Sequence, residues 1–193
     1  GDSLKFNLFV VYGGESLKLD SVGNVYVTGV IYRETTRADY ITIKYNPQGD
    51  TLWVRYYEGP DYYSYDEATA LTVDESGNVY VTGSSRDTSN FGDYATIKYS
   101  YNGGTLWVRR YNGEANARDE PRSINFSSQC LAVDGSGNVY VTGRSSNSIY
   151  YPFNYDYATI KYSPNGDSLW VRRYNGPADS NDFANAIAVD DSG

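Results

Sequence analysis

The chain repeats itself, and a repeat of this kind constrains the fold more strongly than any local motif. A ten-residue block ending in Asn-Val-Tyr-Val-Thr-Gly starts at residues 20, 74 and 134, and a fourth copy begins at Asp190. These starting points lie 54, 60 and 56 residues apart. The chain is therefore expected to be an array of equivalent structural units of this length.

Three further blocks recur in each period. They are an Asp-Tyr-Ala-Thr-Ile-Lys-Tyr type block (residues 39–45, 93–99 and 156–162), a Leu-Trp-Val-Arg block (52–55, 106–109 and 169–172) and an Ala-Ile-Ala-Val type block (70–73, 130–133 and 186–189). Each block is short, rich in β-branched and aromatic residues, and bounded by turn residues, which is typical of a β-strand. Four strands per period with no helical pattern predict an all-β fold, a β-propeller built from four-stranded antiparallel blades.

The hairpin between the third and fourth strands indicates how a blade could present two different faces. Its turns, residues 46–49, 100–103 and 163–166, end in Gly and are typical of type I turns. If Ile43 lies opposite Leu52, one apolar face carries Ile41, Ile43, Leu52 and Val54. The other, mixed face then carries Tyr40, Thr42, Lys44, Trp53 and Arg55.

The order of these blocks resembles a known family. The pattern Asp-x-Ser-Gly-Asn-Val-Tyr-Val-Thr-Gly, then Asp-Tyr-Ala-Thr-Ile-Lys-Tyr, then Leu-Trp-Val-Arg is similar to the bacterial β-propeller repeat called SBBP over almost the whole chain. The first copy departs from it at Ser21 and Val22. The resemblance implies a propeller in a secreted or cell-surface bacterial protein, and it implies no common catalytic residue.

The blocks divide the chain into about three and a half blades. Residues 1–13 are expected to hold the outer strand of a preceding blade, at about residues 4–10. Residues 14–67, 68–126 and 127–182 are expected to be complete blades, and residues 183–193 the inner strand of a following blade, at about 184–189. Three explanations stay open: a piece of a longer propeller, a subunit that pairs with other copies, or an open array of blades. Bare strand edges favour end-to-end pairing of copies through the terminal strands.

Composition excludes several functions. The 193 residues contain no His, which excludes a Ser-His-Asp triad, a Cys-His dyad and His-ligated metals. The single Cys excludes an internal disulfide and a thiolate zinc site. A net charge of −8 disfavours nucleic-acid binding, and no apolar stretch is long enough for a membrane helix. We therefore expect a protein that is not an enzyme, does not bind nucleic acid and does not insert into a membrane.

The 22 tyrosines gather partly in the variable loops. Tyrosine offers flat amphipathic surface at low entropic cost, which suits stacking on sugars or contact with a protein. The candidate ligand-binding residues are Tyr62, Tyr63, Tyr65, Tyr150, Tyr151 and Tyr155. Packing between blades is the alternative role for the same side chains.

Acidic residues form two groups. Asp20, Asp74, Asp134 and Asp190 begin the Asp-x-x-Gly turns and could offer oxygen ligands to calcium, but the spacing lacks the further carboxylates of an EF-hand, so a turn held by its own Asp is favoured and no cofactor is expected. A second group lies near the loops at positions that look non-equivalent: Asp61, Asp66, Glu67, Asp119, Glu120, Asp179 and Asp182. A pair of these could support glycosidase-like chemistry, against the simpler expectation of solvated loop acids.

Basic residues that recur in every period are expected to serve the blades. These are Lys44, Lys98, Lys161, Arg55, Arg109 and Arg172, with Asp39, Asp93, Asp156 or the Trp rings as expected partners between blades. Cys130 aligns with Ala70 and Ala186 and is expected to be a small buried residue. The sequence thus favours a non-enzymatic, extracellular structural or adhesive propeller that assembles with copies of itself into a filament. A propeller that binds carbohydrate or protein through its Tyr-rich loops is the alternative, and a propeller lyase or hydrolase is a weaker one.

Overall fold

A computed structural model describes residues 11–33, 37–61, 64–87, 91–121 and 129–190 of the chain. In that part of the chain every element is a β-strand, and the strands form three antiparallel sheets in the order β1-β2-β3-β4, β5-β6-β7-β8 and β10-β11-β12-β13, with the short β9 pairing with β11. The strands are β1 (Val11–Leu19), β2 (Val25–Arg33), β3 (Arg37–Tyr45), β4 (Thr51–Tyr57), β5 (Asp66–Val73), β6 (Val79–Arg86), β7 (Gly92–Tyr99), β8 (Thr105–Tyr111), β9 (Asp119–Glu120), β10 (Leu131–Val133), β11 (Val139–Ser146), β12 (Tyr155–Tyr162) and β13 (Ser168–Tyr174). This confirms the prediction of an all-β fold made of four-stranded blades, which we call blade 1, blade 2 and blade 3.

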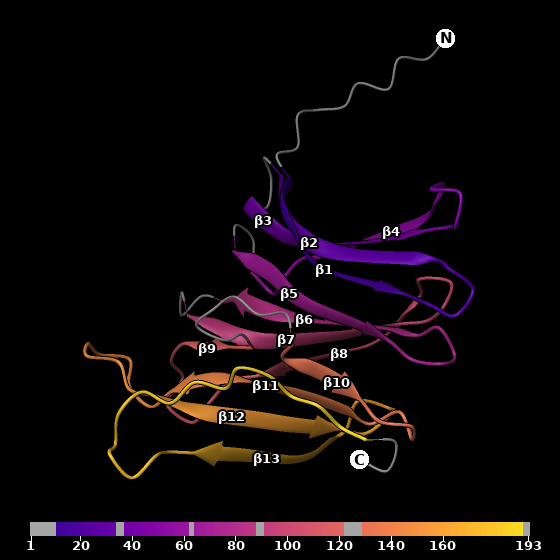
Figure 1. Cartoon of the computed structure of the whole chain (residues 1–193). Helices are drawn as coiled ribbons and strands as arrows, with labels where there is room; N and C mark the ends of the chain where they lie inside the picture. Colours follow the sequence, from indigo (N-terminus) through magenta and orange to yellow (C-terminus); the bar gives the residue numbers. More distant parts are fainter. Residues whose placement is uncertain (1–10, 34–36, 62–63, 88–90, 122–128, 191–193) are drawn as a thin grey trace.

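The three blades are stacked face to face in chain order (Figure 1). The hydrophobic core therefore lies between the sheets. Blade 1 contributes aromatic side chains such as Tyr26, Tyr40 and Trp53, and these pack on small and aliphatic side chains of blade 2, such as Leu71 and Val81. The same arrangement recurs between blades 2 and 3. Each blade thus has an aromatic face, which packs on the next blade, and an aliphatic face, which receives the preceding one.

A buried pair of threonines fixes the register of the second and third strands in every blade. Thr28 and Thr42 are directly opposite and their hydroxyl oxygens lie 3.1 Å apart. Thr82 and Thr96 repeat the contact at 2.9 Å, and Thr142 and Thr159 do so in blade 3. Hydroxyl pairing of this kind satisfies polar groups that would otherwise be buried without partners.

The expected pairing of Ile43 with Leu52 is wrong. Ile43 lies opposite Val54 and Lys44 lies opposite Trp53, with an irregularity between Lys44 and Tyr45 near the turn. The irregularity arises where the turn begins, because its extra residue shifts the register of the strand that follows. Since the error is two residues, the division into an apolar and a mixed face still holds.

The blades begin earlier than the expected boundary at residue 68. Asp66 and Glu67 already pair with Ser85 and Ser84, so the inner strand of blade 2 includes them. In blade 3 the inner strand is divided into β9 and β10, and residues 122–128 between them lie outside the described residues. The inner strand of blade 3 therefore includes residues before the expected strand at 130–133, because β9 pairs with β11 as β10 does.

The two half-blades have different outcomes. The strand expected at residues 4–10 lies outside the described residues. Residues 184–189 are described, but they form no regular strand and run across blade 3 as an irregular segment (Figure 1). An inner strand is completed by pairing with an Asn-Val-Tyr-Val-Thr block, and the 193 residues contain no fourth copy of that block. In the described part of the chain, the structure contains no helix that could cross a membrane.

Candidate functional site

The blades have two distinct ends. At the loop end lie the connections from the second to the third strand, and those from each outer strand to the inner strand of the next blade. At the turn end lie the short hairpin turns that begin at Asp20 and at Asn46 and their repeats. The Tyr-rich segments and most of the loop acids are at the loop end.

Among the candidate ligand-binding tyrosines, Tyr62 and Tyr63 lie outside the described residues. Tyr65 is half-buried. The guanidinium carbons of Arg37 and Arg86 are 5.3 and 5.0 Å from the centroid of its ring. The ring is thus engaged by cations of the chain itself.

Tyr150 and Tyr151 are the open tyrosines of the described loops, with 75% and 87% of their surface exposed. Their loop is braced internally, since Asn147 N donates to Asn154 O at 3.0 Å and Tyr150 N donates to Ser148 Oγ at 3.0 Å. Tyr155 is only 7% exposed and packs between Phe153 and Phe183, with both ring centroids 6.1 Å away. The structure therefore separates two accessible rings from one that serves packing.

The loop acids include three equivalent positions. Asp66 Oδ2 accepts a hydrogen bond from Gly59 N at 2.8 Å, and Asp119 Oδ2 accepts one from Gly113 N at 2.6 Å. Asp182 Oδ2 accepts one from Gly176 N at 2.5 Å. Our interpretation of these acids as non-equivalent is wrong. Asp66 lies seven residues after the Gly that it binds, and Asp119 and Asp182 each lie six residues after theirs. Each carboxylate fixes the connection that leads into a new blade.

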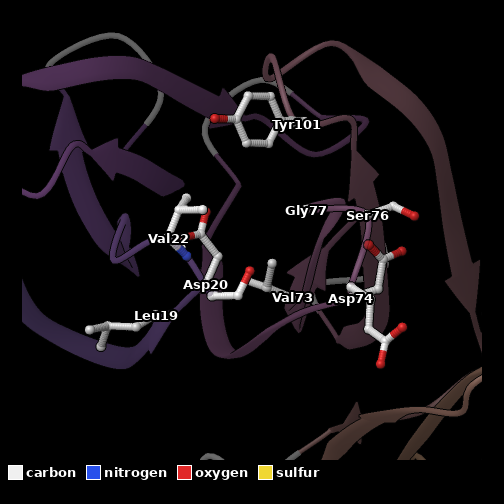
Figure 2. A pocket seen from close by; sticks show the side chains of 10 residues that line it. Leu19, Asp20, Val22, Val73, Asp74, Ser76, Gly77 and Tyr101 are labelled. Atoms are coloured by element: carbon white, nitrogen blue, oxygen red, sulfur yellow. Dashed lines mark hydrogen bonds between the residues drawn. The ribbon is translucent and has the colours of Figure 1, made fainter.

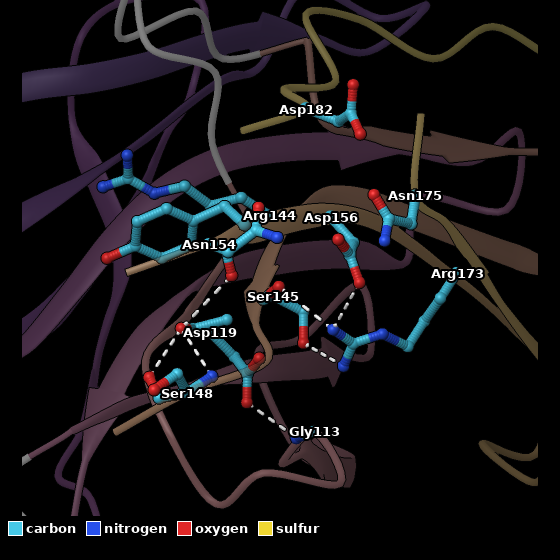
Figure 3. A network of polar contacts seen from close by, with 12 residues as sticks. Gly113, Asp119, Arg144, Ser145, Ser148, Asn154, Asp156, Arg173, Asn175 and Asp182 are labelled. Carbon is cyan, nitrogen blue, oxygen red and sulfur yellow. Dashed lines mark hydrogen bonds and ion pairs between the residues drawn. The ribbon is translucent and has the colours of Figure 1, made fainter. Parts of the chain in front are cut away.

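An ion pair between an Arg of the outer strand and an Asp of the third strand recurs in blades 2 and 3. The Arg173 guanidinium donates to Asp156 Oδ2 at 3.0 Å and to Ser145 Oγ at 2.7 Å, close to Asp119 (Figure 3). In blade 2, Arg110 makes the same contact with Asp93 Oδ2 at 2.9 Å. The recurring Arg of the Trp-Val-Arg-Arg segments thus ties the outer strand to the second and third strands.

In blade 1 a different residue supplies the cationic partner of the buried carboxylate. Tyr56 occupies the position of Arg110, and Ile31 occupies that of Ser85, so the Arg-Ser contact is lost. Arg33, at the end of β2, instead pairs with Asp39. A buried carboxylate in a blade therefore keeps a cationic partner even where the repeat diverges.

Burial is the largest influence on the pKa of Asp93, Asp119 and Asp66. It raises the pKa of Asp93 to about 6, even though Arg110 acts to lower it. It also raises the pKa of Asp119 to about 6, and the nearby charge of Asp93 adds to this effect. The pKa of Asp66 is likewise raised by burial. Burial thus favours the protonated form of all three carboxyls. Asp66 and Asp119 are already engaged in fixing a loop, and Asp93 is paired with Arg110.

The acids at the turn end bind their own turns. Asp134 accepts hydrogen bonds from Ser136 N, Asn138 N and Asn138 Nδ2, and from the Tyr140 hydroxyl at 3.0 Å. Asp20 makes the equivalent contacts, and these lower its pKa although burial acts to raise it. In the described part of the chain, no group of three or more acidic or Cys residues is placed to hold a metal ion.

A groove of about 570 Å³ separates successive turns at this end. The turns that begin at Asp20 and Asp74 form its two sides, and the Tyr101 ring lies beside Gly77 (Figure 2). A Cβ atom on Gly77 would lie 2.6 Å from Tyr101 Cδ2, so the ring needs glycine at this position. A similar groove of about 410 Å³ recurs between blades 2 and 3. These grooves are a consequence of blade stacking.

Three hydrogen-bond donors of blade 1 bind the turn between the third and fourth strands of blade 2. Trp53 Nε1 and Lys44 Nζ donate to Tyr101 O at 3.1 and 3.3 Å, and Arg55 Nε donates to Gly103 O at 2.6 Å. Blade 2 repeats the pattern on blade 3, with Pro164 O and Gly166 O as the acceptors. The predicted role of these residues between blades is thus supported. Their partners between blades, however, are turn carbonyls and not Asp39, Asp93 or Asp156.

The corresponding surface of blade 3 is open. Lys161, Trp170 and Arg172 take the positions of the three donors, and no described residue takes the place of Tyr101 or Pro164. Tyr157 is 37% exposed, whereas its equivalent in blade 2, Tyr94, is fully buried. We call this surface the donor face.

Blade 1 exposes the opposite kind of surface. Leu17 is 54% exposed, whereas its equivalent in blade 2, Leu71, is 2% exposed. Val25 and Val27 are half-buried, whereas Val79 and Val81 are fully buried. Pro47 and Gly49 in the turn of blade 1 match Pro164 and Gly166 of blade 3. We call this surface the acceptor face.

Cys130 is buried between blades 2 and 3, as expected of a small core residue. Burial raises the pKa of its thiol to about 12. A thiol of this kind is protonated and shielded at neutral pH.

Stacked four-stranded sheets that dock by a repeated contact define the class of this protein as a β-propeller. The family model of the SBBP beta-propeller repeat matches residues 52–92 and 106–151, which confirms that these repeats are of the SBBP type. No curated protein matches the chain.

Proposed function

We propose that this chain is a non-enzymatic structural or adhesive protein that associates end to end, with the donor face of one copy bound to the acceptor face of the next. One observation carries the proposal. The donor set used by blades 1 and 2 recurs on blade 3, where no turn among the described residues accepts hydrogen bonds from Lys161 Nζ, Trp170 Nε1 and Arg172 Nε. The acceptor face of blade 1 offers the matching turn.

The chemistry of the two faces is complementary. The donor face carries the cations Lys161 and Arg172 and the indole N–H of Trp170, all of which donate hydrogen bonds. The turn on the acceptor face carries carbonyl oxygens, and the exposed leucines beside it resemble those that the internal interfaces bury. Because the two faces differ, the contact is heterologous, and repeated association gives a ring or a filament.

A location outside the cell, at a bacterial surface, is part of the proposal, and its support is the SBBP repeat itself. A non-catalytic role is supported by the use of the loop carboxylates. Asp66, Asp119 and Asp182 each bind a backbone N–H of a loop, which a catalytic acid or base would have to release.

The test is the mass of the full chain in solution, measured by light scattering over a range of concentrations. We expect wild-type particles that grow with concentration beyond the 21.5 kDa of one chain. Trp170→Ala should shift them to single chains, because it removes the central donor and apolar contact. Tyr150→Ala, which truncates an exposed ring at the loop end, is the control and should leave the mass unchanged. A wild-type chain that stays single at all concentrations contradicts the proposal.

A second candidate function is binding of carbohydrate or protein at the loop end. It is favoured by the braced loop that exposes Tyr150 and Tyr151, since rigid exposed rings bind ligands with little loss of entropy. Tyr65 and Tyr155 contribute less to such a site, because their rings are engaged within the chain.

A further inference from the structure

Residues 182–190 enter blade 3 along the path of an inner strand. Asp182 binds Gly176 N as Asp66 and Asp119 bind Gly59 N and Gly113 N at the start of β5 and β9. Asp182 N also donates to Tyr155 O at 2.6 Å, near the place where Tyr65 bridges Ala38 between blades 1 and 2. The segment is therefore positioned as the first strand of a fourth blade. We call residues 182–190 the terminal segment.

The terminal segment is held on one side only. Ile187 N donates to Gln129 O at 2.9 Å, and the Phe183 ring packs on Tyr155. Ala186, however, is exposed, whereas the aligned Ala70 and Cys130 are buried beneath the second strands of their blades. Its sequence Asp-Phe-Ala-Asn-Ala-Ile-Ala-Val-Asp matches Asp-Glu-Ala-Thr-Ala-Leu-Thr-Val-Asp of residues 66–74. The terminal segment thus has the composition and position of an inner strand, and none of the described strands lies beside it as a second strand.

The internal blades show which strand would complete it. In blade 2 a Cβ atom on Gly83 would lie 2.1 Å from Glu67 O, and in blade 3 one on Gly143 would lie 2.2 Å from Glu120 O. The second strand therefore needs glycine where it crosses the inner strand. A Cβ atom on Gly143 would also lie 2.7 Å from the hydroxyl oxygen of Tyr94 in the preceding blade. Tyr157 is the counterpart of Tyr94 on blade 3. A strand that carries Val-Tyr-Val-Thr-Gly has this chemistry, and β2 has Gly29 at the corresponding position.

End-to-end docking creates a conflict at this position. A second copy that places blade 1 on the donor face brings its own inner strand, β1, to the place that the terminal segment occupies. Only one strand can lie there. β1 carries two register shifts, between Tyr12 and Gly14 and between Gly14 and Ser16, where β5 carries one. Leu17 and Leu19 of β1 are also exposed. We therefore expect β1, the less regular of the two, to give up its place beside β2.

We propose that association proceeds by strand exchange, in which the terminal segment of one copy pairs with β2 of a second copy in place of that copy's β1. This inference rests on the proposed end-to-end association and names how the second copy is bound. The exchange replaces the hydrogen bonds between β1 and β2 with hydrogen bonds between the terminal segment and β2, so its net cost in free energy is small. The docking of the donor face then adds contacts that the single chain lacks.

A reversible lock tests the exchange. Ser16 of β1 lies directly opposite Thr28 of β2, and directly opposed residues of antiparallel strands are close enough for a disulfide. Ser16→Cys with Thr28→Cys, in a Cys130→Ala background that removes the native thiol, ties β1 to β2 when oxidised. We expect the oxidised protein to be single chains of 21.5 kDa and the same protein to associate after reduction. The reduced form is the matched control, because it has the same sequence.

A second variant reports the new pairing directly. Ala186 aligns with Ala70, which lies opposite Thr82, so in the exchanged assembly Ala186 faces Thr28 of the other copy. Ala186→Cys with Thr28→Cys, in the Cys130→Ala background, should form a ladder of disulfide-linked chains on oxidation. If the oxidised Ser16→Cys/Thr28→Cys protein still associates, the exchange is wrong but end-to-end association remains. If the Ala186→Cys/Thr28→Cys chains associate but form no disulfide-linked ladder, the same conclusion holds. A Cys130→Ala parent that stays single contradicts both.

Discussion

Trp53 of blade 1 donates its indole N–H to the carbonyl oxygen of Tyr101 in blade 2, 3.1 Å away. Trp107 makes the same contact with Pro164 O at the next interface, also at 3.1 Å. The recurring Trp is therefore directed at the neighbouring blade and not at its own. A contact that is repeated with this precision explains why the chain keeps Leu-Trp-Val-Arg in every period.

Trp107→Phe should destabilise the protein by about 2 kcal/mol, because it removes one of the two donors to Pro164 O and part of a packed ring. Trp170→Phe, on the open donor face, should change the free energy of unfolding of the single chain by less than about 0.5 kcal/mol. Both values follow from urea unfolding monitored by circular dichroism. Equal effects would show that the Trp contributes within its own blade.

Gly143→Ala should be costly, since the new Cβ atom would lie 2.2 Å from Glu120 O, which belongs to a backbone that cannot move freely. Forcing the two strands apart is expected to cost about 2 kcal/mol or more. Gly104→Ala is the control, because its nearest neighbour is the Ser100 hydroxyl at 3.2 Å. Thermal unfolding of both variants checks the difference, and a stable Gly143→Ala protein would contradict the close crossing of inner and second strands.

Stability should depend on pH through the buried carboxyls. Asp93 and Asp119 have their pKa raised from 3.8 to about 6, so in the folded state they bind protons more tightly than when unfolded. Their contribution to stability is fully present below pH 3.8 and is lost as the pH rises through 6. We therefore expect the free energy of unfolding to fall between pH 4 and pH 6.5. Asp119→Asn should flatten this slope by at most about 1.4 kcal/mol per pH unit, and the exposed Glu75→Gln should not.

Chelation of divalent metals should leave the unfolding temperature unchanged. The oxygens of Asp134 already accept four hydrogen bonds from Ser136, Asn138 and Tyr140, so the turn satisfies its own carboxylate. Asp134→Ala should cost about 1 kcal/mol in the presence or absence of calcium. Scanning calorimetry with and without EDTA measures both effects, and a drop on chelation would assign a metal to these turns.

The loop-end candidate makes its own prediction. Tyr150→Ala with Tyr151→Ala should leave the unfolding temperature within about 1 °C, because both rings are exposed. If the loop end binds carbohydrate, the same variant should lose at least about tenfold in affinity for glycans that the wild type retains on an array. Tyr56→Ala, which truncates another exposed ring, serves as the control. Unchanged glycan binding by the double variant would remove this candidate.

Local rules were enough to predict the elements. The four blocks became strands because β-branched and aromatic residues alternate within them, and Gly77 and Gly103 adopt positive φ in the turns where glycine was expected. The pairing of Ile43 was missed because an irregularity beside the turn shifts the register by two residues, and no feature of the sequence marks it. The common role of Asp66, Asp119 and Asp182 was missed because the residues between each outer strand and its Asp differ, and the first of these loops is one residue longer than the other two. Aligning Tyr-x-Gly before each of them would have been a usable signal.

The sequence by itself determined that this protein is made of repeated four-stranded sheets, because strand formation and turn geometry depend on residues close together in the chain. Only the tertiary structure decided which residues join the blades and which stay open. Lys44, Lys98 and Lys161 are identical in their local sequence, yet two of them bind a neighbouring turn and the third lies on the donor face. Contacts between blades depend on what lies beyond each face, and that information is held in the arrangement of the sheets.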